Sequence, residues 1–417
     1  MSPSSPNRWL IALAGVILQL ALGAVYAWSV FRTPLVKGFG WTISQVTLTF
    51  TIAIFTLGVA AFVGGLWMRR SGPRIVAIAG GVLYGAGVFL AGFSNHGLWV
   101  LYLAYGVIGG AGLGLGYIVP IATLVKWFPD RRGFITGIAV AGFGAGALVT
   151  APIATRLIAG VGVLSTFQIL GVAYFILVVG SAMFMVNPTQ DYRPAGWTPN
   201  AAETAAARNY TLGEALRTWQ WYALWALLFL NVTAGIAIIS QAAPMASEIT
   251  GVSAVAAAGM VGIISIANGS GRFLWAWLSD FTGRRWVFLA MFLLQAILFF
   301  VMPTVSAFGV FTLLAFVILL CYGGGFGTMP AFAADYFGSR EVGSIYGLML
   351  TAWGFGSALG PLLIAHLRET TGRYDEALRI ISVIMLVSSV IPFIVHPPSE
   401  RRASGSFPSP HPRPSRP

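Results

Sequence analysis

Residues 126–142 read KWFPDRRGFITGIAVAG, a cluster of charges and aromatic rings followed by a glycine-rich apolar run. Such a step from a basic loop into an uncharged run is typical of a chain that enters a membrane. A similar stretch, DYFGSREVGSIYGLMLTAWGFG, occupies residues 335–356, about 210 positions later. Since this offset is half the chain length, the pattern predicts two related halves, as in transporters built from repeats.

The composition predicts that lipid, rather than water, surrounds most of the chain. Of its 417 residues, 57% are hydrophobic and 9% are charged, whereas soluble domains carry about 25% charged residues. Twelve apolar stretches are long enough to span a bilayer. They cover residues 9–31, 42–68, 75–93, 98–125, 134–155, 163–186, 219–246, 252–279, 286–302, 308–334, 342–365 and 377–395. The first is longer than a signal-peptide core, so we expect it to be retained.

The apolar stretches divide the chain into four parts. We expect an N-terminal six-helix bundle over 1–186, a cytoplasmic linker over 187–218, a C-terminal six-helix bundle over 219–396 and a disordered cytoplasmic tail over 397–417. The predicted fold class is all-α integral membrane, with twelve transmembrane helices in two six-helix pseudo-symmetric bundles.

The distribution of charge predicts the topology. The net charge is +12, but the basic residues lie in short clusters between apolar runs, so we expect no nucleic-acid partner. Most of the 24 Lys and Arg residues fall on the side of the N-terminus, which predicts a multi-pass protein of the cell inner membrane with both termini cytoplasmic. Cys321 is the one cysteine, which excludes a disulfide within the chain. We expect no metal or cofactor.

Two motifs resemble a known superfamily. Residues 278–285, LSDFTGRR, resemble the signature between paired spans of the major facilitator superfamily. In the first half, Arg69 stands where that signature has an acid, which predicts a gate that is weaker or built differently there. Residues 127–142 resemble the fifth-span motif of the monocarboxylate transporters and of the bacterial oxalate:formate antiporters, and residues 26–28, YAW, also resemble that group. The resemblance implies a twelve-helix transporter that works as a monomer.

Arg272 is the one clear charge inside a predicted span. A guanidinium in hydrocarbon is costly and cannot lose its proton, so it needs a partner or a polar cavity. The twelve acids all fall at span ends, in loops or in the tail, which favours a carboxylate substrate as the counter-ion. The alternative is an arginine that snorkels to the surface. Asn268 lies four residues earlier on the same helix face and is predicted either to bind substrate or to hold Arg272.

The resemblance implies further substrate-binding residues. Tyr26, Tyr117, Phe143, Tyr322 and Phe326 match positions that line the cavity of the oxalate:formate antiporters, although each is also consistent with ordinary packing. Those antiporters carry a lysine in the eleventh span where this chain has Trp353, so one cation here suits one carboxylate. The animal monocarboxylate transporters carry an aspartate where this chain has Asn268, which does not titrate.

A gate is predicted from charges on the cytoplasmic side. We expect ion pairs between the halves to close this side, formed among Asp280, Arg284, Arg340, Glu341, Lys126 and Asp335.

The predicted function is transport of a small monocarboxylate, such as lactate or pyruvate, by alternating access. Proton-coupled symport is the expected coupling, with the proton carried on the substrate, His366 or Asp335, while the uncompensated Arg272 favours carboxylate exchange as the alternative. A buried arginine argues against export of a cationic drug. An integral-membrane enzyme is the alternative from another class, and the scattered histidines and acids argue against it.

Overall fold

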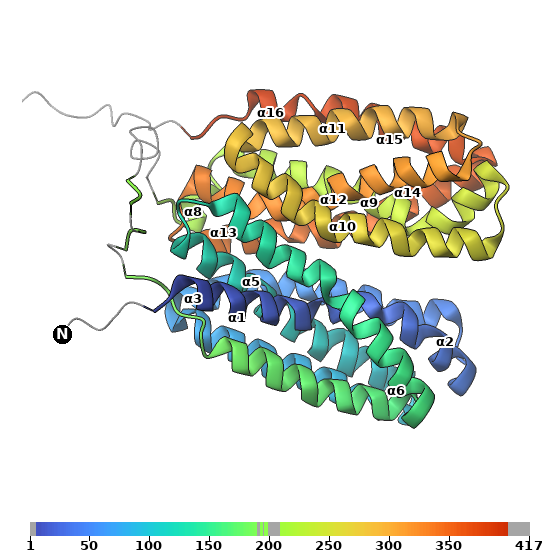
Figure 1. Cartoon of the computed structure of the whole chain (residues 1–417), viewed down its shortest axis with the longest axis horizontal. Coiled ribbons are helices and arrows are strands. Elements are labelled where there is room, and N and C mark those ends of the chain that lie inside the picture. The colour runs from blue at the N-terminus through green and yellow to red at the C-terminus, as the bar shows by residue number, and fades with distance from the viewer. Residues whose placement is uncertain (1–5, 190–191, 195, 199–208, 399–417) are drawn as a thin grey trace, which may run out of the picture.

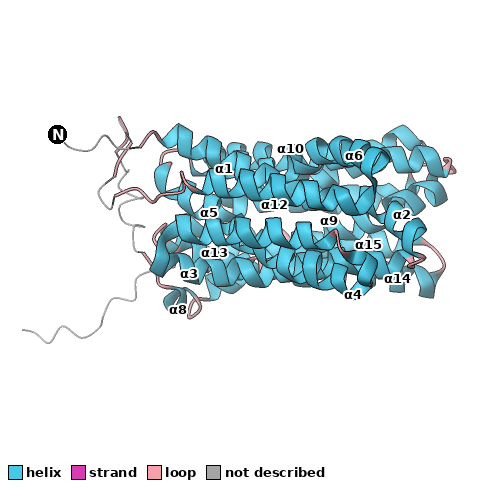
Figure 2. Cartoon of the chain, turned by 90° about the horizontal axis from the view of Figure 1, so that it is seen from below, coloured by secondary structure: helices cyan, strands magenta, loops and turns pink. Residues whose placement is uncertain are grey.

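The computed structural model describes residues 6–189, 192–194, 196–198 and 209–398, and the described residues form helices and loops. Figure 1 shows two bundles of long helices lying side by side, one from each half of the chain. The long helices run roughly along the long axis of the molecule, as Figure 2 also shows, so each bundle is one membrane-spanning layer deep.

The first half begins with a broken helix. A turn of 3-10 helix, η1 (Gly23–Ala27), separates α1 (Arg8–Leu22) from α2 (Trp28–Phe39). Helix α3 (Ile43–Ala91) is followed by η2 (Ser94–His96), α4 (Leu98–Leu101), a π-helical segment η3 (Tyr102–Gly109) and α5 (Gly110–Trp127). Helix α6 (Arg132–Ala182) completes this half.

The second half is preceded by a short helix, α8 (Leu212–Ala215). Its long helices are α9 (Trp219–Thr250), α10 (Ala254–Thr282), α11 (Arg284–Val301) and α12 (Phe308–Phe337), with η4 (Met302–Thr304) after α11. A break near Leu350 separates α13 (Val342–Met349) from α14 (Thr351–Thr371). Helices α15 (Tyr374–Ser388) and α16 (Ile391–Ile394) end the bundle.

Twelve spans are present once the breaks are considered. By length and apolar composition, eight helical stretches among the described residues are able to cross a membrane. Two of them, α3 and α6, each hold two spans, because Gly72 and Gly162 leave the helical conformation and reverse the chain. Helix α10 and the pair α13–α14 supply the remaining two. The predicted fold class is therefore confirmed.

The internal repeat is visible in the turns. Glycines with positive φ pair between the halves: Gly40 with Gly251, Gly72 with Gly283, and Gly162 with Gly372. Each pair is about 210 residues apart, the offset that the sequence predicts. Only glycine adopts this backbone readily, so the two halves turn at equivalent places for the same reason.

One end of the molecule carries both termini of the described chain (Figure 1). We refer to it as the linker end, since the described residues of the segment 187–218 also lie there. Part of that segment docks on the second half: the Tyr210 amide donates to the carbonyl oxygen of Phe337 at 2.9 Å. The rest of the predicted linker falls partly, and the predicted tail almost wholly, outside the described residues.

Candidate functional site

Arg272 lies on α10, and none of its surface is exposed to solvent. Its Nη2 donates to the Tyr26 hydroxyl at 3.2 Å, and its Nε donates weakly to Asn268 Oδ1 at 3.4 Å. Its Nη1 is buried without a hydrogen-bond partner. In the part of the chain that the structure describes, no carboxylate pairs with this guanidinium. One edge of the cation therefore has capacity to bind an anion.

The position of Arg272 follows from close packing of α10 on α12. Glycines at Gly323 and Gly327 allow it, because a Cβ at Gly327 would stand 1.9 Å from the Arg272 carbonyl oxygen. A Cβ at Gly323 would stand 2.1 Å from the Asn268 carbonyl oxygen. Small residues at this spacing bring the two backbones together and fix the register of Arg272 and Asn268 beside α12.

Tyr26 reaches the site from the other half. It lies in η1, where the first span departs from α-helical geometry. The turn packs directly on α6, since a Cβ at Gly23 would stand 1.9 Å from the Phe143 carbonyl oxygen. The Tyr26 ring lies edge-on to the Phe143 ring, and their centroids are 5.3 Å apart. The hydrogen bond from Arg272 to Tyr26 thus joins the two halves at the level of the site.

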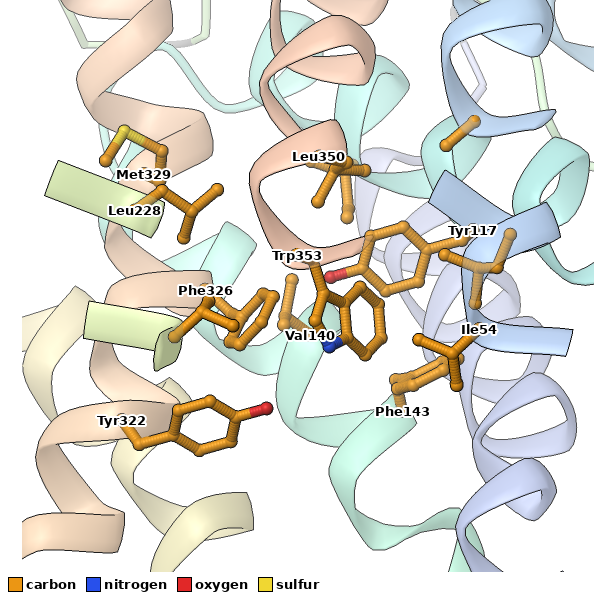
Figure 3. Close-up of a cluster of buried hydrophobic side chains, with 14 of the residues drawn as sticks. Ile54, Tyr117, Val140, Phe143, Leu228, Tyr322, Phe326, Met329, Leu350 and Trp353 are labelled. Carbon is orange, nitrogen blue, oxygen red and sulfur yellow. The ribbon is translucent and has the colours of Figure 1, made fainter. Parts of the chain in front are cut away.

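Six aromatic rings surround the guanidinium, and we call them the aromatic box: Tyr26, Tyr117, Phe143, Tyr322, Phe326 and Trp353. The Arg272 Cζ lies 4.8 Å from the Phe326 centroid and 5.8 Å from that of Phe143. Figure 3 shows Trp353 between Phe326 and Tyr117, with the Tyr322 hydroxyl pointing into the same space. These faces stabilise the cation and enclose it in apolar surroundings.

Trp353 connects the rings of both halves. Its centroid lies 4.9 Å from that of Phe326 and 6.1 Å from those of Tyr117 and Phe143. The break between α13 and α14 allows this, because Trp353 follows it by three residues. All eight residues that the sequence predicts for substrate binding are therefore brought together around one point.

Two buried amides hold the helices that carry the site tyrosines. Gln19 of α1 donates through Nε2 to the Tyr117 carbonyl at 3.1 Å, and Asn231 of α9 donates through Nδ2 to the Tyr322 carbonyl at 3.0 Å. Gln295 of α11 supports Asn231 by donating to its Oδ1 at 3.1 Å. Sequence reasoning missed these three residues, although uncharged amides inside apolar spans are a signal for such bonds.

Polar contacts between the halves gather at the linker end. Asp280 accepts the amides of Gly133 and Phe134, at 2.8 and 2.7 Å, at the start of α6. A helix N-terminus carries partial positive charge, which suits a carboxylate. Arg132 also crosses between the halves and meets Asp335 at 2.7 Å. The structure is thus closed at this end.

Arg284 supports this closure from within the second half. It pairs with Asp280 at 2.7 Å and with Asp335 at 2.9 Å, and it also donates to the Ser279 hydroxyl. Both acids are therefore held by a cation of their own half while they contact the other half.

A second ion pair also crosses between the halves at the linker end. Arg69 of α3 pairs with Glu341, the residue before α13, at 2.9 Å. The other Glu341 oxygen accepts the Leu212 amide at 2.9 Å. Here Arg69 of the first half supplies the cation, and Glu341 at the start of α13 in the second half supplies the acid. Arg69 and Arg132 were absent from the predicted gate set.

Two predicted gate cations have a different environment. Lys126 donates to the Asn187 side chain at 3.3 Å, and both Lys126 and Arg340 line a cavity at the linker end. Of the six predicted gate residues, Asp335 and Glu341 form ion pairs across the halves. Arg284 pairs with Asp280 and Asp335 within the second half.

The sequence matches the model of the Major Facilitator Superfamily over residues 11–274 and 226–416. The chain belongs to this superfamily. A member from Escherichia coli (strain K12), named as an uncharacterized MFS-type transporter, is 32% identical over 86% of this chain and 88% of its own. The oxalate:formate antiporter of Oxalobacter formigenes is 27% identical over 94% of this chain and 93% of its own.

Further similarities support the fold of this superfamily member. Apicoplast pyruvate carrier 1 of Toxoplasma gondii is 27% identical over 77% of this chain and 68% of its own. The crystal structure of the fucose:proton symporter of Escherichia coli superimposes with a TM-score of 0.72, at 16% identity, over 93% of this chain and 98% of that one. The chain is thus a multi-pass transporter and not an enzyme.

Proposed function

We propose that this transporter carries a small monocarboxylate, such as lactate or pyruvate, by alternating access, with Arg272 as the group that binds the anion. The observation that carries the proposal is the guanidinium itself. It is fully buried, it has no acid partner among the described residues, and its Nη1 makes no hydrogen bond. A carboxylate supplies both the missing charge and the missing acceptor.

The rest of the site supports a small substrate with one charge. Among the described residues, Arg272 is the one cation beside the aromatic box, and Trp353 adds an apolar wall by packing on Phe326. A second carboxylate on the substrate would be desolvated there without a counter-charge, which is unfavourable. Relatives named for oxalate:formate antiport and for pyruvate transport support carboxylates as the substrate class.

Proton-coupled symport is the coupling that we propose. Asn268 does not titrate, and the Asp335 carboxylate is engaged by Arg132 and Arg284 at the linker end. His366 is exposed on α14. The proton therefore travels on the carboxyl group of the substrate or through one of these end groups.

Carboxylate exchange is the second candidate. The uncompensated Arg272 favours it, because return of the empty carrier moves a buried cation without a counter-ion.

The proposed cycle uses the two halves as rigid bodies. The contacts of Asp280, Arg132 and Arg69 across the halves close the linker end, so substrate enters from the opposite end in this state. We propose that the linker end is cytoplasmic, that the membrane is the cell inner membrane, and that the protein works as a monomer.

The test is uptake by purified protein in liposomes. We expect labelled lactate to accumulate when an inward proton gradient is imposed, and Arg272→Ala to abolish the accumulation. Arg272→Lys is the matched control, because it keeps the charge but loses the two-pronged geometry, and it is expected to retain part of the activity.

The same liposomes separate symport from exchange. Uptake that requires a carboxylate preloaded in the lumen, and that ignores the proton gradient, establishes exchange. Lactate and pyruvate that move in neither format contradict the proposed substrate.

A further inference from the structure

A polar cavity of about 230 Å³ lies at the linker end between the two halves. The first half lines it with Gly65, Met68, Arg69, Lys126 and Asn187, and the second half with Arg340, Glu341, Gly343 and Ser344. A water molecule takes about 30 Å³ of liquid volume, so the space suits several waters or one small ion. It is separate from the aromatic box, with which it shares no residue.

The cavity has more cations than acids. Three of its side chains are cationic, Arg69, Lys126 and Arg340, and Glu341 is its one acid. Glu341 is already bound by Arg69 at 2.9 Å and by the Leu212 amide. Lys126 has the neutral Asn187 as its hydrogen-bond partner, at 3.3 Å. Lys126 and Arg340 therefore contribute positive charge that no carboxylate lining the cavity offsets.

The two surplus cations come from different halves. Lys126 is in the last turn of α5, and Arg340 lies in the loop between α12 and α13. Lys126 is nine residues from Tyr117 along α5, which places the cavity about 14 Å from the aromatic box toward the linker end. Like charges that face one cavity repel each other, so closure of this end is opposed unless an anion lies between them.

We propose that this cavity binds a small oxyanion, a phosphate or a carboxylate, held between Lys126 of the first half and Arg340 of the second. Arg69 lines the same space and is available as a further donor. The bound ion contacts both halves and favours the closed linker end, because opening moves the two cations apart and the anion then loses one of them.

The experiment measures thermal unfolding of the purified full chain by the fluorescence of its tryptophans. Inorganic phosphate replaces chloride at constant ionic strength. We expect the Tm to rise by about 2 °C at a phosphate concentration tenfold above its Kd. The rise persists in Arg272→Gln, because the aromatic box is not involved, so the result is independent of the proposed transport function.

The decisive variant is Lys126→Gln/Arg340→Gln, in which we expect phosphate to leave the Tm unchanged. Its matched control is Arg70→Gln/Arg131→Gln, which removes the same charge from exposed arginines outside the cavity and is expected to keep the shift. If the double variant does not fold, the two single substitutions are each expected to weaken phosphate binding about tenfold.

Two results overturn the proposal. One is no phosphate-dependent shift in the wild-type chain, and the other is an equal shift in Lys126→Gln/Arg340→Gln, which indicates general salt stabilisation. A parallel titration with lactate in Arg272→Gln distinguishes the sources of the ion. A lactate shift that depends on Lys126 and Arg340 identifies the cavity as a station for the transported substrate, whereas a shift with phosphate alone identifies a separate ligand.

Discussion

The two halves repeat four of the six rings of the aromatic box but not its charge. At the repeat offset, Phe143 corresponds to Trp353, and Tyr117 corresponds to Phe326, so each half supplies a matching pair of aromatic walls. Arg272, in contrast, corresponds to Ala61, which is buried in α3. The repeated positions build a symmetric enclosure, and a single unrepeated arginine gives it a charge.

The polar groups of the site are divided between the halves. Tyr26 corresponds to Ala237, so the hydroxyl that meets Arg272 is also unrepeated. The first half thus supplies the Tyr26 hydroxyl as an acceptor, and the second half supplies the cation together with Asn268. Because the polar groups are asymmetric although the two bundles are related by symmetry, we expect the site to bind one small anion in one orientation.

The largest effect is expected from moving the charge. Arg272→Ala should lower kcat/KM for lactate uptake by at least about 100-fold, because it removes the charged partner of a buried carboxylate. Adding Ala61→Arg should not restore uptake, since Tyr26 and Asn268 are placed for α10. Uptake rates in liposomes measure both, and recovery in the double variant would show that the charge alone suffices.

The amide contacts should differ in strength between the halves. Asn231→Leu should destabilise the protein by about 2 kcal/mol, because it breaks the bond to the Tyr322 carbonyl and removes the Oδ1 acceptor of the Gln295 amide, which keeps its bond to the Met291 carbonyl. Gln19→Leu should cost about 1 kcal/mol, since it breaks one bond. Thermal unfolding measures both values. Asn231→Leu/Gln295→Leu should be milder than the sum of the single changes, and strict additivity would contradict the proposed coupling.

Selectivity should respond to a second cation. Trp353→Lys adds a second positive charge to the aromatic box and should raise the ratio of oxalate to lactate uptake about tenfold, because a dianion then has two partners. Trp353→Phe is the control, which keeps an apolar ring and should leave the ratio unchanged. Competition of unlabelled oxalate against labelled lactate measures the ratio. A ratio that is unchanged in Trp353→Lys places the second carboxylate elsewhere.

The smallest effects are expected at the two linker-end contacts. Asp280→Asn removes a negative charge that two backbone amides and Arg284 bind, whereas Glu341→Gln breaks one ion pair, with Arg69. We expect Asp280→Asn to speed thiol labelling of Ser344→Cys about fivefold, and Glu341→Gln about twofold. Arg69→Glu/Glu341→Arg should return labelling to the rate of the parent. Equal rates in all variants would mean that packing alone closes this end.

The sequence was most informative where a residue type permits few environments in a membrane. A lone arginine in an apolar span predicts a buried anion site, and the glycine-rich repeats predict two similar bundles. Both the superfamily and the fold class are confirmed by comparison and structure. The eight predicted substrate-binding residues lie together, yet their role in transport stays a prediction.

Other features depend on geometry that the sequence does not display. The partners of Arg69 and Arg132 lie more than 200 residues away in the sequence, and many acids at span ends compete for them. Gln19, Asn231 and Gln295 look like isolated polar residues until the helices pack. The cavity between Lys126 and Arg340 exists because helix ends of the first half meet a loop and a helix start of the second half, and local sequence patterns do not indicate this contact.

The hydrogen bond between Arg272 and Tyr26 bears on the electrical work of transport. In the empty carrier Arg272 keeps its full positive charge inside the protein, because the Tyr26 hydroxyl that accepts its hydrogen bond is neutral. A bound carboxylate turns that charge into a neutral pair, and moving a neutral pair through a low-dielectric interior costs less than moving a lone ion. Without a proton, the loaded transporter should therefore respond more weakly to membrane voltage than the empty one. A proton carried with the substrate restores the charge, so under symport the two strokes should respond equally to voltage.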